Sequence, residues 1–480
     1  MRRLWLVVLV AASLLAASCG SDSDDDGEEQ ATPTDPETTE SETTDTSATD
    51  TDDSGAGSAE AETSDSSAGT GGDGEDESAP EPEPVVLTSS WTGVTPETIK
   101  VGVAGIDFTR LQEFGVDIEG IVAEIWAPAW VDAFNRRGGA HGRMMEVVVR
   151  NFLPVGNIES DAVCAELTED EEVFVVLGAM LGDNPLCVTQ LHETPYVGMF
   201  GLTAERAEKS IAPFFASEMA ADLQRSNSTK ALISERTFDG ARLAVFWEIA
   251  DDPVANNVVL PLLEEAGVNV VAKGTLLDFA GDTQASEAAI DVIFENFAAA
   301  GADMYLNISG LVPFNRSIDR NRPGVPFVLL NGQLTNSAII ATSGYDPDIL
   351  VDAIGVTASK PTLEEWFAND DWNVCVDEIN AYFPGTIDID TLPEAVAEGI
   401  GQACQGFRLL EHLLIAAGPE LTPDALVEAA DDTGELLLPG MIAGSLGPGK
   451  YSVGDVVRYY TYDIETKNML PDGDPIVVTR

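Results

Sequence analysis

The chain has 480 residues and is strongly acidic, with 83 Asp and Glu residues against 24 Lys and Arg and a formal net charge of −59. This charge argues against nucleic acid or an anionic lipid surface as a binding partner. Beyond a polar N-terminal stretch, roughly 395 residues have the composition of a folded protein, which is too many for one hydrophobic core. The sequence therefore predicts two lobes.

The first twenty residues predict export from the cytoplasm. Arg2 and Arg3 precede an apolar run over residues 4–17, which is followed by Ser18 and Cys19. A basic start and a short apolar core are typical of a signal peptide, and the run is shorter than the ~20 residues of a membrane span. The segment resembles the lipobox of bacterial lipoproteins, which implies that residues 1–18 are removed and Cys19 is acylated. The alternative is an ordinary secretory signal with a chance cysteine.

The composition of residues 19–85 predicts a tether. Residues 20–85 consist almost wholly of Asp, Glu, Ser, Thr, Gly, Ala and Pro and contain no Lys or Arg. Such a segment buries too little apolar surface to offset the entropy of ordering, so we expect it to be disordered. Its expected role is to let the folded part, residues 86–480, stand off a membrane face.

Strands and helices alternate along the folded part. Apolar runs predict strands over residues 99–103, 144–152, 174–178, 196–200, 242–247, 268–277, 304–308 and 326–330, and a terminal hairpin from residue 456. Helical spacing predicts helices over residues 118–136, 159–171, 256–266, 283–300, 363–383 and 395–417. This alternation predicts an α/β fold with two lobes, each a parallel sheet flanked by helices. Ligands of such sheets bind outside the carboxyl ends of the strands.

Four cysteines remain if Cys19 carries lipid, and they allow three pairings. Sequence proximity favours Cys164 with Cys187 and Cys375 with Cys404, and disulfides are the default in an exported protein. Free buried thiols are the alternative. We expect no metal site, because the chain has no C-x-x-C spacing and its histidines are His141, His192 and His412.

Residues 93–102 and 130–143 resemble a known family. They read GVTPETIKVG and WVDAFNRRGGAHGR, similar to the opening strand and first helix of branched-chain amino-acid-type solute-binding proteins of ABC importers. The resemblance implies the periplasmic binding protein type I fold, in which two Rossmann-like lobes joined by crossing segments close on a small ligand. Cys164 and Cys187 fall where many members of that family place a disulfide. The second cysteine pair also resembles one found in some members.

The first lobe offers candidate ligand contacts in the loops that follow its strands. They are Thr109, Phe114, Leu181, Asp183, Leu202 and Thr203. In the family, backbone N–H groups and Ser or Thr hydroxyls of such loops bind a ligand carboxylate, and Thr203 matches a hydroxyl position of that pattern. Phe114 matches an aromatic that closes over the ligand. As alternatives, Thr203 caps a helix and Phe114 belongs to the core.

The second lobe offers a matching set at its own strand ends. It comprises Trp247, Glu248, Ser309, Gly310, Asn331 and Gln333. Amino-acid binders of the family carry an acidic residue near the last loop, where this chain has Asn331 and Gln333. This departure leaves room for an amide, a urea-like compound or a carboxylate as the ligand, beside the branched-chain amino acid that the resemblance implies. As alternatives, Trp247 belongs to the core, and Glu248 is either solvated or paired with an arginine of the hinge.

Enzyme motifs are weak in this sequence. Residues 444–450 have the glycine and lysine spacing of a P-loop, but Tyr451 follows where Ser or Thr is required, so we predict a turn. The folded part contains no G-x-S-x-G motif. The sequence thus predicts a monomeric, lipid-anchored solute-binding component of an ABC importer, without catalysis or cofactor, that delivers a small molecule to a permease. The alternatives are a ligand-sensing receptor domain without transport and an exported α/β hydrolase.

Overall fold

The computed structural model describes residues 86–111, 120–154, 156–279, 282–310, 312–332 and 345–478. All of them belong to one unit of the chain, residues 81–480. The signal and tether predicted for residues 1–85 lie outside the described ranges. Within those ranges, no helix combines the length and the apolar character that crossing a membrane requires.

The first lobe is built on a parallel sheet. Its strands are β1 (Thr98–Ile106), β2 (Met144–Phe152), β3 (Val175–Gly178), β4 (Tyr196–Gly198) and β5 (Phe214–Ala216), in the spatial order β2-β1-β3-β4-β5. Val101 of β1 pairs with Val147 of β2 on one side and with Val175 of β3 on the other. Every residue of β3 is buried, as expected for a central strand covered on both faces.

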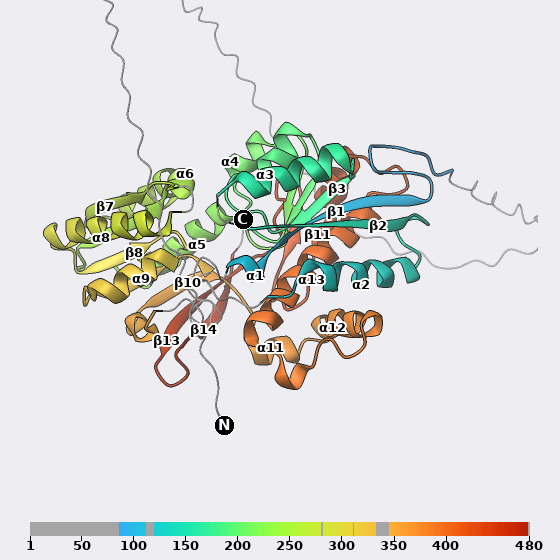
Figure 1. Cartoon of the computed structure of the whole chain (residues 1–480). Helices are drawn as coiled ribbons and strands as arrows, with labels where there is room; N and C mark the ends of the chain where they lie inside the picture. Colours follow the sequence, from blue (N-terminus) through green and yellow to red (C-terminus); the bar gives the residue numbers. More distant parts are fainter. Residues whose placement is uncertain are drawn as a thin grey trace, which may run out of the picture. The chain divides into compact units, whose positions relative to one another are not determined.

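Helices cover both faces of this sheet, as Figure 1 shows. The helical segments are α1 (Phe108–Leu111), α2 (Ala123–Arg136), α3 (Ile158–Ala165), η2 (Glu166–Asp170), η3 (Cys187–Leu191), α4 (Ala204–Lys209), α11 (Leu363–Phe367), α12 (Asp370–Tyr382), η8 (Ile389–Thr391), α13 (Glu394–Ala416) and α14 (Pro423–Thr433). Buried residues of α2, α12 and α13 form one core with Val101, Val175 and Leu177. Residues of α3 form the core of the other face. A short ribbon of β11 (Gly434–Glu435) and β12 (Ser445–Leu446) follows α14.

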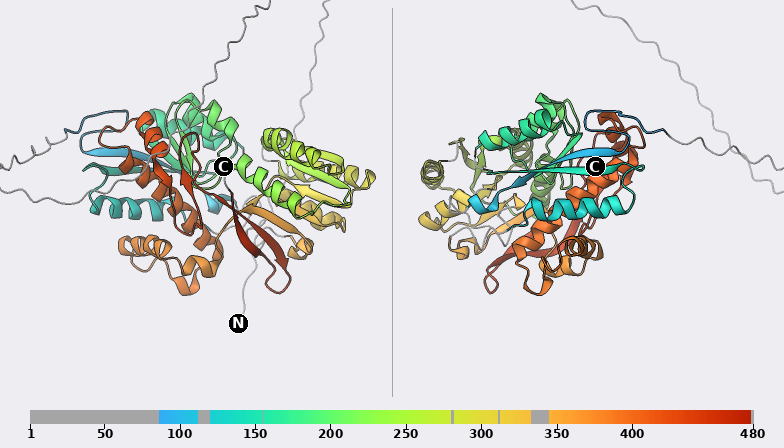
Figure 2. Two further views of the ribbon diagram at one scale, coloured as in Figure 1. Left: turned by 180° about the vertical axis from the view of Figure 1, so that it is seen from behind. Right: turned by 45° about the vertical axis from the view of Figure 1, so that its right-hand side comes forward.

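The second lobe repeats the plan and extends it. Its strands are β6 (Leu243–Glu248), β7 (Val270–Leu276), β8 (Met304–Asn307), β9 (Phe327–Leu329), β10 (Ile354–Ala358), β13 (Val456–Asp463) and β14 (Asn468–Val477), in the order β14-β13-β10-β9-β8-β6-β7. The strands from β6 to β10 are parallel, and the β13–β14 hairpin joins β10 in antiparallel pairing. Figure 2 shows this hairpin in dark red.

Two aromatic and aliphatic cores flank the second sheet. The helical segments are α5 (Ala221–Ser234), η4 (Ile249–Asp251), α6 (Asp252–Val254), η5 (Ala255–Val259), α7 (Leu260–Glu265), α8 (Thr283–Ala299), α9 (Val312–Asn321) and η7 (Pro347–Leu350). On one face, Phe294 and Phe297 of α8 pack against Tyr305 and Phe314. On the other face, residues of α5, η5 and α7 pack against β6 and β8.

The chain crosses between the sheets three times. The crossings run over residues 217–220, 359–362 and 447–455. The third crossing is bonded to the first sheet, because the Ala216 N–H donates to the Tyr451 carbonyl over 2.8 Å. The second crossing is bonded to β13, because the Ser359 N–H donates to the Val456 carbonyl over 2.9 Å. Backbone hydrogen bonds thus tie the second and third crossings to strands of the two sheets.

The α/β prediction is confirmed, and most predicted elements occur within a few residues of their expected ends. The helix predicted over residues 363–383 is wrong in one respect, because it is two helices. The Asn369 side chain accepts a hydrogen bond from the Trp372 N–H and so begins α12 anew after α11 has ended. The predicted P-loop-like turn holds Lys450, whose ammonium group lies 2.9 Å from the Asp455 carboxylate.

Both cysteine pairs favoured by proximity are bonded in the structure, Cys164 with Cys187 and Cys375 with Cys404. The first pair links α3 to η3, and the second links α12 to α13. Both disulfides therefore belong to the first lobe.

Candidate functional site

The strand order of each sheet marks where a ligand would bind. In the first sheet β1 lies between β2 and β3, and in the second β6 lies between β7 and β8. The connections leave such a central strand in opposite directions, which opens a crevice at its carboxyl end. A ligand is therefore expected at the loops that follow β1 and β3 in one lobe and β6 and β8 in the other.

In the first lobe, hydrogen bonds fix the loops after β3 and β4. The buried Tyr196 hydroxyl accepts from the Met180 N–H over 2.9 Å, which places the chain just before Leu181. The Arg206 guanidinium donates to Asp183 over 2.8 Å and to the Gly201 carbonyl over 2.6 Å. Asp183, a predicted ligand contact, therefore forms an ion pair with Arg206, and this pair holds the loops after β3 and β4 to each other.

Thr203 takes the role that the sequence analysis gave as its alternative. Its hydroxyl oxygen accepts from the Arg206 N–H over 3.1 Å and so caps α4. This bond leaves the hydroxyl hydrogen available to a ligand. The neighbouring carbonyl of Leu202 accepts from the Ala221 N–H over 2.8 Å, at the first residue of α5. The predicted loop therefore contacts the helix that opens the second lobe.

Thr109 lies exposed on α1, just after β1. The Asp107 carboxylate accepts from the Arg110 N–H over 3.2 Å, and Arg110 forms two hydrogen bonds with Glu159. These bonds from Arg110, with one from the Leu153 N–H, hold the pKa of Glu159 below its usual range. Phe114, the other predicted contact of this region, lies outside the described residues.

In the second lobe, Ser309 joins the ends of β6 and β8. Its hydroxyl accepts from the Glu248 N–H over 2.9 Å and donates to an Asp251 carboxylate oxygen over 2.5 Å. The Ser309 N–H donates to the Asn307 side-chain oxygen over 3.0 Å. The Asn307 side-chain nitrogen is buried and has no partner among the described residues. The structure thus brings together Glu248 and Ser309, both predicted, with Asp251, which sequence reasoning missed.

Glu248 is electrostatically unusual. Burial raises the pKa of its carboxyl group to about 8, and the negative charges of Asp251 and Asp278 act in the same direction. The group can therefore be protonated near neutral pH and can donate a hydrogen bond as well as accept one. Perturbed carboxyl groups at a strand end are candidates for ligand recognition.

The other predicted residues of the second lobe fall into three cases. Trp247 is a core residue: it is 4% exposed, and its indole N–H donates to Asp252 over 2.9 Å. Its placement as a ligand contact is therefore not supported by its packing. Gly310 lies against the Asn331 side chain, because a Cβ added at Gly310 would come within 2.5 Å of the Asn331 Cγ. Gln333 lies outside the described residues.

Helix α5 connects the strand ends of the two lobes, and sequence reasoning missed it. Its first residue, Ala221, bonds to Leu202 of the first lobe, while its buried Arg225 donates to the Ile308 carbonyl of the second over 3.0 Å. Arg225 also bonds to the side chain of Gln224. The buried face of α5 is largely polar, so no apolar periodicity marked this helix in the sequence.

A second feature lies at the crossings, where a cavity of about 40 Å³ is lined by residues of all three crossing segments and of α13. The Lys360 ammonium lies 3.0 Å from the Glu398 carboxylate, and Gln402 bonds to Glu218 over 3.4 Å. Burial raises the pKa of Glu218, and the Lys360 charge opposes that rise. Burial would lower the pKa of Lys360, but the charges of Glu398 and Glu218 raise it overall. The region around this cavity, where the three crossings meet α13, is therefore polar and charged.

Two sheets whose parallel strands share one order, joined by three crossings with strand ends linked through α5, define a bilobal α/β fold, the type I fold of periplasmic binding proteins. The comparison with solved structures gives the particular relatives of this fold.

A solute-binding protein of an ABC transporter from R. palustris, solved with 4-hydroxybenzoate, matches with a TM-score of 0.58, 17% identity, and coverage of 79% of this chain and 97% of that one. The periplasmic binding protein type 1 from Bordetella pertussis matches with a TM-score of 0.56, 15% identity, and coverage of 78% and 100%. The branched-chain amino acid binder LivJ from Streptococcus pneumoniae, solved with isoleucine, matches with a TM-score of 0.55, 13% identity, and coverage of 80% and 99%.

At these identities the likeness establishes the fold. No protein-family model and no curated protein matches the chain.

Proposed function

We propose that this protein is the extracytoplasmic solute-binding component of an ABC importer. It captures a small polar molecule between its lobes, closes, delivers the molecule to a permease, and performs no catalysis. The observation that carries the proposal is the connection through α5, which touches the strand-end loops of both lobes at Leu202 and Ile308. A ligand that contacts both sets of loops only when the lobes close would stabilise the closed state.

The chemistry of the second lobe favours a polar ligand with both donors and acceptors. Glu248 offers a carboxyl group that is protonated over part of the neutral range, and Asn307 holds a buried side-chain N–H group without a described partner. Such groups favour a ligand able to complete their hydrogen bonds, since an unpaired buried donor is unfavourable. A branched-chain amino acid, an amide, a urea-like compound or a carboxylate fits this description. The first ligands to screen include isoleucine and 4-hydroxybenzoate.

Binding is tested with one variant from each lobe. Thr203→Val removes a hydroxyl at nearly constant volume, and Ser309→Ala removes the hydroxyl between Glu248 and Asp251. Thr203→Val should weaken binding of the ligand found by thermal-shift screening about five- to a hundred-fold, as expected for a lost hydrogen bond to a buried polar group. Ser309→Ala should weaken it because Glu248 and Asp251 lose the hydroxyl that holds them together. The measurement is calorimetric titration.

The matched control is Thr422→Val. Thr422 caps α14 as Thr203 caps α4, with a hydroxyl that accepts from the Ala425 N–H over 3.1 Å, yet it lies on a helix away from the strand ends. Loss of this cap should leave affinity unchanged. If Thr203→Val and Ser309→Ala both bind as the parent does, the strand-end loops do not hold the ligand.

The anchor is tested separately at Cys19. Its acylation would attach the mature chain to a membrane through a tether of acidic residues, and stable attachment requires more than one acyl chain. Cys19→Ala should release the protein into the soluble fraction, measured by fractionation and immunoblotting. Persistent membrane association of this variant would contradict the lipid anchor while leaving the solute-binding role open to its own test.

A further inference from the structure

The disulfide of the first lobe lies in an unusual pair of helical turns. Cys164 belongs to α3, which continues into the π-helical turn η2, and Cys187 begins the π-helical turn η3. Five residues after Cys164 comes Glu169, and five residues after Cys187 comes His192. The His192 N–H donates to the Cys187 carbonyl over 3.1 Å, which places His192 one turn beyond Cys187. Such π-turns occur often at functional sites.

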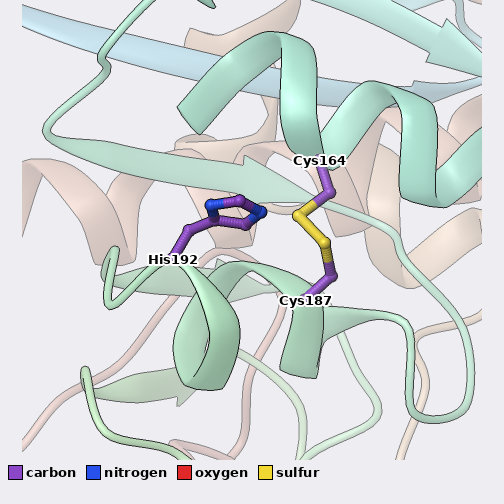
Figure 3. Close-up of side chains that lie close together, drawn as sticks. All are labelled: Cys164, Cys187 and His192. Atoms are coloured by element: carbon purple, nitrogen blue, oxygen red, sulfur yellow. A yellow bond between two sulfur atoms is a disulfide. The ribbon is translucent and has the colours of Figure 1, made fainter. Parts of the chain in front are cut away.

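The two turns face each other and bring four side chains together. Cys164 is bonded to Cys187, and the His192 Nδ1 atom lies 3.6 Å from a Glu169 carboxylate oxygen. A ring nitrogen of His192 and both sulfur atoms lie within 4.8 Å of one another. Figure 3 shows the imidazole ring beside the disulfide, with one ring nitrogen pointing toward the sulfurs.

We propose that, once this disulfide is reduced, Cys164, Cys187 and His192 form a zinc site. Two thiolates and an imidazole are ligands that Zn²⁺ prefers, and a water molecule completes a tetrahedral set. The Cα atoms of the cysteines are 6.3 Å apart, so side-chain rotation can open the S–S bond to the spacing of two ligands at ~2.3 Å from one ion. Glu169 beside Nδ1 would orient the ring, as carboxylates commonly do for metal-bound histidines.

The proposed steps balance as follows. Reduction by a trialkylphosphine and water converts the disulfide into two thiols and the phosphine into its oxide, so the phosphine supplies both electrons and water supplies the two thiol protons. Zn²⁺ then binds both sulfurs as thiolates, and the two thiol protons pass to solvent. The metal restores a link between α3 and η3, in place of the covalent bond. This site is independent of the ligand cleft and of the proposed transport role.

The other disulfide provides an internal control, because no His, Asp or Glu side chain among the described residues is grouped with both of its sulfurs. The Arg408 guanidinium donates to the Cys375 sulfur over 3.5 Å, and the paired residue Cys404 is fully buried. A guanidinium offers no lone pair to a metal ion. The structure therefore assigns metal binding to the first pair and denies it to the second.

The test uses cobalt(II) as a spectroscopic probe on the phosphine-reduced protein. We expect one equivalent of Co²⁺ to give thiolate charge-transfer absorption and tetrahedral d–d bands, with displacement by Zn²⁺ and no such signal in the oxidised protein. The double variant Cys375→Ser/Cys404→Ser should keep this signal. Cys164→Ser/Cys187→Ser should lose it. The reverse pattern would overturn the proposal.

Two single variants test the histidine and its neighbour. His192→Gln should bind Co²⁺ at least tenfold more weakly than the parent, and Glu169→Gln about tenfold more weakly, as expected for a ligand and for the group that orients it. Equal affinity in parent and His192→Gln would reduce the site to two thiolates and contradict the assignment. Circular dichroism monitors the fold throughout. Zn²⁺ should raise the thermal midpoint of the reduced parent, or restore its fold if reduction unfolds it, and should do neither for reduced His192→Gln.

Discussion

The two lobes share a strand order but are stabilised by different means. In the first lobe, two disulfides fasten helices around the sheet, and Arg408 of α13 forms ion pairs with Glu378 of α12 and with Glu411 of its own helix. The second lobe has no disulfide among its described residues and relies on aromatic packing around Phe294. One strand plan thus tolerates covalent or purely noncovalent stabilisation. The lobes should therefore respond separately to reduction and to core mutation.

The largest expected effect comes from reducing both disulfides. The bridges span 23 and 29 residues, and each should contribute about 3 kcal/mol in the chain-entropy model. We expect the first lobe to melt at a markedly lower temperature while the second keeps its midpoint, giving two transitions in differential scanning calorimetry. A single transition that shifts as a whole would show that the lobes unfold together and would break the comparison.

The second lobe should respond most to Phe294→Ala. Phe294 is 3% exposed and packs against Phe297, Tyr305 and Phe314. Its truncation leaves a cavity and should lower the free energy of unfolding of this lobe by about 3–5 kcal/mol. Denaturant unfolding of the disulfide-intact protein measures the effect. Leu277→Ala is the control, because Leu277 is 60% exposed and its truncation should change little.

Glu248 should give the second lobe a dependence on pH. Its pKa is raised from about 4.5 to about 8 by burial and by nearby carboxylates. The folded state then binds more protons than the unfolded state between these values, so stability falls as pH rises from 4.5 to 8. Glu248→Gln should flatten this dependence and raise the thermal midpoint at pH 8 by a few degrees. An identical pH profile in parent and variant would refute the assignment.

The smallest expected effects come from single helix caps, one in each lobe. Thr422 caps α14 of the first lobe, and Asp282 caps α8 of the second by accepting from the Ala285 N–H over 3.0 Å. Replacement of either by Ala should lower the stability of its own lobe by about 1 kcal/mol. Calorimetry after selective reduction, which separates the two transitions, assigns each loss. A cap substitution that shifts the midpoint of the other lobe's transition would reveal coupling through the crossings.

The sequence predicted most of the fold because its strands are apolar runs that end at glycine or polar residues. The run of Phe174 to Gly178 became β3, and the hairpin after residue 456 became β13 and β14. Helix α5 was missed because Gln224, Arg225 and Ser228 face the interior and replace the apolar stripe that marks most helices. Their burial depends on partners in the second lobe, which no local pattern contains.

The candidate site was predicted in part. The strand-end rule located Glu248 and Ser309, which the structure joins through one hydroxyl, and it located Thr203. It also selected Trp247, whose side chain turns into the core, because alternation along a buried strand does not reveal which face meets a cleft. Asp251 and Arg225 were missed, since their roles arise only when loops distant in sequence meet.

The crossings also determine the order in which the lobes can be completed during synthesis. One face of the first sheet, with Val101 and Leu177, packs against α13 (Glu394–Ala416), which the ribosome makes only after the parallel strands of the second lobe. A nascent chain that ends at β5 already contains α2 but would leave the part of this face that α13 covers exposed, and exposed apolar surface is prone to aggregate. The core of the first lobe also contains Leu446 and Val453, so this lobe cannot be completed until nearly all of the chain has been made.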